Sequence, residues 1–184
     1  MSQNSVFDFN SQVVSPCLSP HDIPRNRQIS KAYADWSEKM TDWSGAVFGT
    51  LTFEFQPHTE EKAWKLVETF YWRLCYQYAK SKGLQHRWKR MAPVGVFAME
   101  RGTTGTKRLH AHFLLDKVAS EVSYKAIHDV WAGVDKRLCG YSQIEPPRGI
   151  KGASYYVSKF AGYSAKGSSV LVYPDMADLA GGKR

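Results

Sequence analysis

The pattern of hydrophobic and polar residues along the chain predicts an alternation of helices and short strands. Four segments with apolar residues at helical spacing are predicted helices: residues 27–43, 60–82, 120–131 and 149–163. Four short segments are predicted strands: residues 46–55, 93–100, 108–115 and 141–145. The elements therefore follow the order helix, strand, helix, strand, strand, helix, strand, helix.

This order contains a βαββαβ core, the split-βαβ arrangement of ferredoxin-like and RRM-like domains. We expect an α+β fold with a central antiparallel sheet and helices mainly on one face. A length of 184 residues suits one domain, and a hydrophobic content of 43% is sufficient for its core. Prolines among serines and asparagines predict a partly disordered N-terminal arm over residues 1–26, followed by the folded domain at 27–166 and a Gly/Ser-containing tail at 167–184.

The strand predicted at residues 108–115 contains two histidines, His110 and His112, in an otherwise apolar run. Alternation along a strand places both imidazoles on one face. The preceding strand ends at Glu100, and a connection folded symmetrically about Gly105 brings Glu100 opposite His110. Two imidazoles and a carboxylate are metal ligands that leave coordination positions open, as catalytic sites do. The alternative is a pair of surface or hydrogen-bonded histidines with no ligand.

The charge of the chain indicates an acidic partner. The formal net charge is +8, which favours nucleic acid first and an anionic membrane surface second. Five cations and a tryptophan gather in residues 80–90, a run that either contacts phosphate or forms a solvated surface. The candidate DNA-binding residues are Lys80, Lys82, Arg87, Lys89, Arg90, Arg101, Lys107, Arg108, Arg148 and Lys151.

The three cysteines, Cys17, Cys75 and Cys139, are odd in number and lack CxxC spacing. This argues against a disulfide framework or a zinc ribbon and is typical of a reducing cytoplasm. We expect no secretory signal at the start of the chain and no membrane partner, because no apolar stretch approaches membrane-spanning length.

Three segments, in order, resemble the motifs of the HUH endonucleases, and within them the rolling-circle replication initiator (Rep) proteins of plasmids and single-stranded DNA phages or viruses. Residues 48–53 resemble the first motif of that family, and His110-Ala111-His112 is similar to its histidine-hydrophobic-histidine signature. Residues 156–159 (Tyr-Val-Ser-Lys) resemble its tyrosine–lysine motif. The resemblance covers roughly residues 45–166, so the domain at 27–166 is expected to be the endonuclease domain.

The resemblance implies that Tyr156 attacks a DNA phosphate and that Lys159 contacts the phosphate or favours the tyrosinate. It also implies that Glu100, His110 and His112 bind a divalent metal, Mn²⁺ or Mg²⁺. The product would be a 5′-phosphotyrosine and a free 3′-hydroxyl that primes replication. Single-stranded or supercoiled origin DNA, a host helicase and a host DNA polymerase are the implied partners, in the host cytoplasm.

Two departures from the family pattern limit the expectation. Phage-type initiators have a second tyrosine four residues after the first, where this chain has Phe160, and Tyr163 is out of that register. We therefore expect one working tyrosine, with Tyr155 and Tyr163 as alternatives to Tyr156. No Walker-type phosphate loop is present in the sequence, so strand separation by ATP hydrolysis is not expected of this chain.

Two other functions remain open. A plasmid-mobilisation relaxase or an HUH transposase would use the same chemistry for a different purpose. An RRM-like module would bind single strands without cutting them, by stacking bases on aromatic residues of the open sheet face. The sequence offers two histidines and a glutamate on that face instead, which favours the enzyme.

Overall fold

The computed structural model describes residues 23–101, 108–158 and 170–174. The α-helices in this part of the chain are α1 (Ile23–Lys39), α2 (Glu60–Ser81), α3 (Tyr124–Ala132) and α4 (Ile150–Ser158), and two short 3-10 helices are η2 (Gln85–Met91) and η3 (Val118–Ser120). The strands are β1 (Val47–Phe53), β2 (Gly95–Arg101), β3 (Leu109–Leu115), β4 (Cys139–Glu145) and β5 (Val170–Tyr173).

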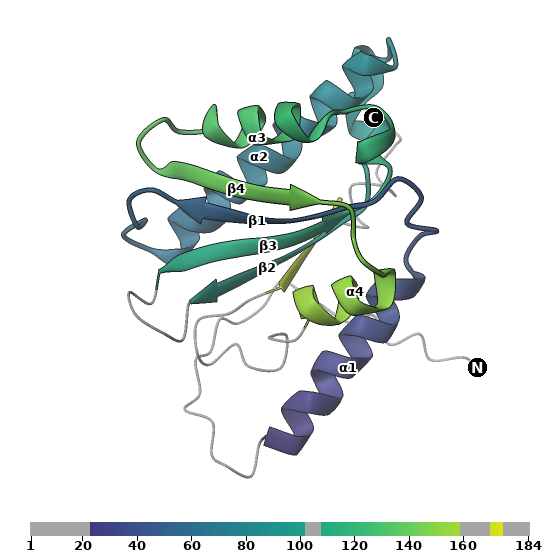
Figure 1. The fold of residues 1–184 in the computed structure, drawn as a ribbon, viewed down its shortest axis with the longest axis vertical. Coiled ribbons are helices and arrows are strands. Elements are labelled where there is room, and N and C mark those ends of the chain that lie inside the picture. Colours follow the sequence, from purple (N-terminus) through teal and green to yellow (C-terminus); the bar gives the residue numbers. More distant parts are fainter. Residues whose placement is uncertain (1–22, 102–107, 159–169, 175–184) are drawn as a thin grey trace, which may run out of the picture.

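The strands form one antiparallel sheet in the order β4-β1-β3-β2-β5, with β3 at its centre (Figure 1). Strands β1 to β4 with helices α2 and α3 form the βαββαβ core. The predicted α+β class, the antiparallel sheet and the split-βαβ arrangement are therefore confirmed.

Helices α2 and α3 cover one face of the sheet, where the larger core lies. Alternate residues of β1 are buried there, among them Leu51 and Phe53, and pack with rings such as Phe70 and Trp131. Thr59 caps α2, because its side chain accepts a hydrogen bond from the backbone N–H of Lys62.

The second face carries a smaller core and an open half. Helix α4 lies against β2 and β3, and α1 packs against α4 (Figure 1). Val157 of α4 is buried with Leu114, Val96 and Trp43 at this end of the sheet. The last helix was expected on the face that carries the histidines, and it is found there. The position of α1 beside α4 was not expected, so this side of the sheet carries two helices where one was expected.

Both boundaries of the folded domain differ from expectation. Helix α1 begins at Ile23, inside the segment expected to be an arm; residues 1–22 lie outside the described residues. Strand β5 lies in the predicted tail and pairs with β2 at the edge of the sheet. The four residues of β5 follow a glycine- and serine-rich stretch, and their apolar run is too short to be distinguished from a loop by periodicity.

Gly49 is required where β1 pairs with β3. It pairs with Phe113, and a Cβ at residue 49 would lie 2.5 Å from Cζ of Phe113 and 2.8 Å from the carbonyl oxygen of Gln143. We expect Gly49→Ala to lower the free energy of unfolding by about 1–3 kcal/mol, because the ring and the neighbouring strand must move. The control is Gly152→Ala in α4, whose Cβ meets nothing within 4 Å. It should raise stability by about 0.5–1 kcal/mol. Urea denaturation measures both, and equal stabilities would contradict this packing.

Candidate functional site

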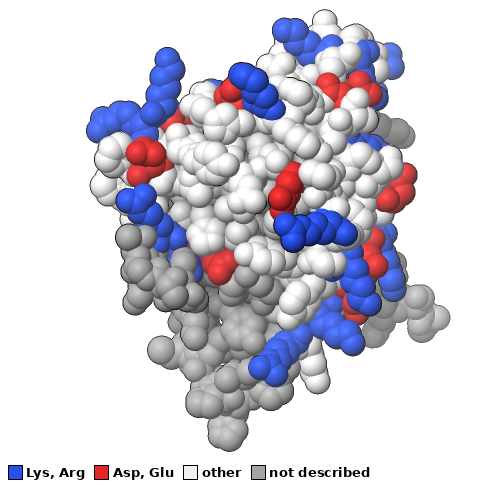
Figure 2. Space-filling view, viewed as in Figure 1, with Lys and Arg blue, Asp and Glu red and all other residues white. Residues whose placement is uncertain are grey.

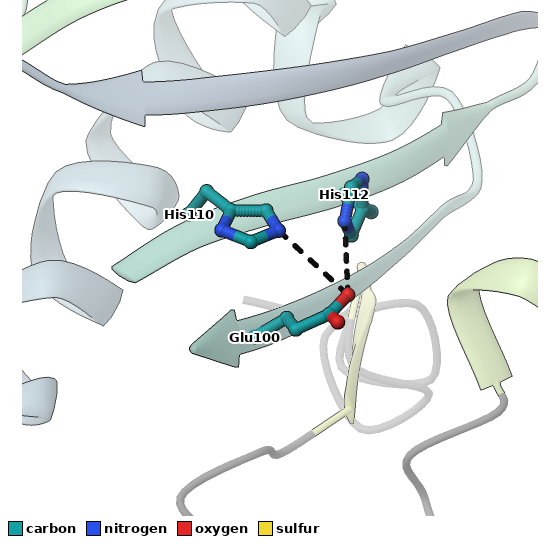
Figure 3. Close-up of side chains that lie close together, drawn as sticks. All are labelled: Glu100, His110 and His112. Atoms are coloured by element: carbon teal, nitrogen blue, oxygen red, sulfur yellow. Dashed lines mark hydrogen bonds and ion pairs between the residues drawn. The ribbon is translucent and has the colours of Figure 1, made fainter. Parts of the chain in front are cut away.

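Glu100, His110 and His112 converge on the second face of the sheet, near the end where β3 begins (Figure 3). The strand register pairs Glu100 directly with His110, as the symmetric hairpin predicts, and pairs Ala98 with His112. Because the two histidines are two residues apart on β3, both side chains leave the sheet on the same side. The side chain of His112 is 5% exposed, that of Glu100 12% and that of His110 22%, so the cluster opens to solvent on the His110 side.

The distances within the cluster suit a shared cation. Oε2 of Glu100 lies 3.2 Å from Nε2 of His112 and 3.7 Å from Nε2 of His110. One ligand atom from each residue falls within 4.8 Å of the others. Ligand atoms bound to one ion at about 2.0–2.2 Å lie about 3–4 Å apart, so small side-chain adjustments would suffice to hold it. Three protein ligands are fewer than a hard divalent ion takes, which leaves positions for water or substrate.

Hydrogen bonds on the far side of both rings orient the imidazoles. Nδ1 of His110 lies 3.2 Å from the carbonyl oxygen of Arg108, and Nδ1 of His112 lies 2.9 Å from Oγ1 of Thr50 on β1. The carbonyl can only accept, so Nδ1 of His110 carries a proton, and the Thr50 hydroxyl can accept from His112 in the same way. Nε2 of His112 lies within hydrogen-bond distance of Oε2 of Glu100, at 3.2 Å, and in the absence of an ion it donates to this carboxylate, which can only accept. With an ion bound, both Nε2 atoms and the carboxylate would bind it as ligands. Three such acceptors repel one another unless a proton or a cation lies between them.

Thr50 provides a test of this orientation. We expect Thr50→Val to weaken Mn²⁺ binding by about 10- to 100-fold, because His112 loses the acceptor that fixes its tautomer. The matched control is Thr52→Val, since Thr52 lies on the same face but donates its hydrogen bond to the carbonyl oxygen of Tyr141. Isothermal titration calorimetry measures both affinities. An unchanged affinity in Thr50→Val would show that the ring orientation does not depend on this bond.

Tyr156 of α4 stands beside the cluster. Its ring packs edge-on against His112, with centroids 4.7 Å apart, and against Phe48 of β1 at 5.6 Å. Burial of Ala153 and Val157 fixes the face that α4 turns to the sheet. Tyr155 is 57% exposed, and in the described part of the chain its ring has no aromatic contact. The geometry thus brings Tyr156 rather than Tyr155 to the histidines; Lys159, Phe160 and Tyr163 lie outside the described residues.

A small pocket adjoins Tyr156 on the side of β1 and β4. Its volume is about 220 Å³, and its lining residues are Phe48, Gly49, Thr50, Gln143, Glu145 and Tyr156. The sequence pattern did not single out Gln143 or Glu145 as site residues. The one signal for them in the sequence was their alternation, which places both side chains on one face of a predicted strand. That signal was not sufficient, because the sequence did not predict which strand lies beside β4.

The candidate DNA-binding residues do not form one group. Arg101 is the last residue of β2 and Arg108 directly precedes β3, whereas Arg148 and Lys151 are exposed at the start of α4. Lys107 lies outside the described residues. Figure 2 shows lysines and arginines mainly around the margin of the side in view, with acidic residues among them.

The basic run at 80–90 is not brought to the cluster. It spans the end of α2 and most of η2. Helix η2 precedes Gly95, which lies at the opposite end of β2 from Glu100. The five residue steps from Gly95 to Glu100 span about 17 Å of strand. Trp88 packs on Trp72 of α2, and Lys82 pairs with Glu121 at 2.7 Å. The structure therefore places Lys80, Lys82, Arg87, Lys89 and Arg90 away from the Glu100–His110–His112 cluster, and their contact with phosphate stays a prediction. The charge pattern alone does not indicate which end of a sheet such a run occupies.

Two further expectations concerned the cysteines and the membrane. Cys75 and Cys139 are free, and burial raises the pKa of Cys75 to about 12 and that of Cys139 to about 11, so both remain inert thiols near neutral pH. Among the described residues, no helix combines the length and apolarity needed to span a bilayer.

Comparison with protein-family models, with curated proteins and with solved structures finds no match to this chain. The functional interpretation therefore rests on the residues of the site and on the motifs in the sequence.

Proposed function

We propose that the chain is a metal-dependent DNA nicking and joining enzyme of the HUH class that uses Tyr156 to initiate rolling-circle replication. The observation that supports this most is the contact between Tyr156 and His112, which places a tyrosine beside two histidines and a glutamate. The sheet alone would suit many activities, but this combination suits phosphodiester chemistry in particular.

In the proposed reaction, the Tyr156 oxygen attacks a backbone phosphorus and the bond to the 3′ oxygen breaks. The tyrosine loses its proton, and the departing oxygen gains one to become a 3′-hydroxyl. The 5′ end stays bound to the protein as a phosphotyrosine, which conserves the bond energy and allows the strand to be rejoined by the reverse reaction. A divalent ion held by Glu100, His110 and His112 would supply charge neutralisation at the phosphate oxygens.

The chain's own residues have three tasks in this scheme. Thr50 and the carbonyl of Arg108 orient the two imidazoles. The packing of α4 on the sheet holds Tyr156 against His112. Lys159 would contact the phosphate or favour the tyrosinate, a role that we carry over from the motif resemblance.

The direct test is formation of a covalent protein–DNA adduct. The protein is incubated with a pool of single-stranded oligonucleotides and Mn²⁺ or Mg²⁺, then separated on a denaturing gel. We expect an adduct that survives denaturation, disappears with a chelator and contains a phosphotyrosine. A relaxase or transposase would give the same adduct, and a hairpin origin beside the gene would favour replication over them. A non-catalytic RRM-like module would bind the pool and give no adduct.

The form of the DNA should decide the rate of nicking. No obvious helix for reading the major groove lies on the open half of the described sheet, so the scissile strand must already be unpaired. We expect efficient nicking of single-stranded and negatively supercoiled origin DNA and little nicking of relaxed linear duplex, without ATP or host extract. A host helicase and polymerase would then extend the strand in the cell. Equal rates on the three substrates at one ionic strength would contradict this prediction.

A further inference from the structure

The pocket beside Tyr156 has the size and chemistry of a binding site for one nucleobase. Its volume of about 220 Å³ is smaller than the roughly 300–1,000 Å³ of pockets for drug-sized ligands. Phe48 and Tyr156, whose rings meet at 90°, form two of its walls and offer aromatic surface to a planar ligand. Thr50 connects the pocket to the cluster, since it lines the pocket and its hydroxyl contacts His112. A base in this pocket would therefore lie next to the reacting phosphate.

Gln143 and Glu145 supply polar groups from β4. They lie two residues apart on one strand, across from Thr50 and Phe48 of β1, so both face the pocket side of the sheet. In the described part of the chain, neither side chain has a hydrogen-bond or ion-pair partner. Polar groups that line a pocket without protein partners are available to a ligand.

The carboxylate of Glu145 indicates what that ligand presents. A negative group repels a phosphate, so the sugar–phosphate backbone is disfavoured in the pocket itself. A carboxylate accepts hydrogen bonds and donates none, so it selects a ligand edge with adjacent donors. In an unpaired strand, the Watson–Crick edge of each base is open to such contacts.

We propose that this pocket binds a guanine of the nucleotide next to the cleaved phosphate. Guanine has two adjacent donors on that edge, N1–H and N2–H, which a carboxylate accepts together, and its O6 accepts from the amide of Gln143. Adenine and cytosine each offer one donor beside an acceptor, and thymine has one donor between two acceptors. Glu145 and Gln143 thus determine sequence specificity at one position. This inference rests on the proposed function.

The test uses a randomised single-stranded library with Mn²⁺, followed by sequencing of the strands that become linked to the protein. With the natural chain, we expect guanine to predominate at one position within two nucleotides of the linked phosphate. Glu145→Gln should change that preference from guanine to adenine or cytosine, because an amide pairs one acceptor with one donor. Adducts should form on these strands, with the remaining consensus unchanged. The matched control is Glu68→Gln on α2, an exposed carboxylate outside the pocket.

A binding measurement gives a readout without chemistry. In the Tyr156→Phe background, replacing the selected guanine by inosine, which lacks N2–H, should weaken binding by about fivefold or more. The same replacement should have no effect in the additional Glu145→Gln variant.

The outcomes separate the two proposals. No adduct with any strand would overturn the proposed function itself. Adducts without a base preference beside the linkage, or with a preference that Glu145→Gln leaves unchanged, would overturn the guanine pocket alone. Loss of adduct with every sequence in Glu145→Gln would also overturn it, and would assign Glu145 to proton transfer from Tyr156.

Discussion

Tyr156→Phe abolishes nicking and adduct formation and leaves DNA binding nearly unchanged: this is the expected result with the largest effect. The substitution removes the oxygen that forms the bond to phosphorus in the proposed reaction. It keeps the ring that contacts His112 and Phe48, so the packing of α4 is preserved. Loss of an enzyme nucleophile lowers the rate by about 10⁴-fold or more. Gel assays for adduct and nicked DNA, with fluorescence anisotropy for binding, measure the two effects separately.

The controls are the neighbouring tyrosines. Tyr155→Phe should keep full activity, because Tyr155 is 57% exposed and turned away from the cluster. Tyr163→Phe tests the other candidate. An adduct that persists in Tyr156→Phe and is lost in either control would show that the wrong tyrosine had been assigned.

The convergence of Glu100, His110 and His112 could be predicted from the sequence because short-range rules determine their placement. Alternation along β3 puts His110 and His112 on one face, and a short connection leaves few registers for β2. The symmetric register that pairs Glu100 with His110 is the one found. The choice of Tyr156 over Tyr155 required more, since it depends on which face of α4 is buried on the sheet.

Other features depend on contacts between distant segments and could not be predicted. The pocket needs β4 beside β1, so Gln143 and Glu145 acquire their surroundings only in the folded sheet. The basic run at 80–90 has a clear composition, yet the path of α2 carries it to the far end of the sheet. Strand β5 gains its stability from pairing with β2 rather than from its own four residues.

The second large effect concerns the proposed metal ligands. His110→Ala and His112→Ala are each expected to remove cleavage, while Glu100→Ala reduces it less. Each imidazole offers a directional nitrogen whose far side is fixed by a hydrogen bond, so nothing nearby replaces it. Water can partly replace a carboxylate oxygen on a hard divalent ion. Adduct yield at several Mn²⁺ concentrations should show that excess metal partly restores Glu100→Ala and does not restore the histidine variants.

Calorimetry with Mn²⁺ separates loss of the ion from loss of the fold. The double variant His110→Ala/His112→Ala should show no saturable binding, and unchanged affinity there would refute the metal site. His112 is almost fully buried, so its removal also costs packing, and thermal melting without metal measures that cost. His128→Ala is the matched control, because His128 on α3 bonds Ser142 at 2.8 Å and lies outside the cluster. It should bind Mn²⁺ as the natural chain does, because the loss of a histidine outside the cluster leaves the ligand atoms of Glu100, His110 and His112 in place.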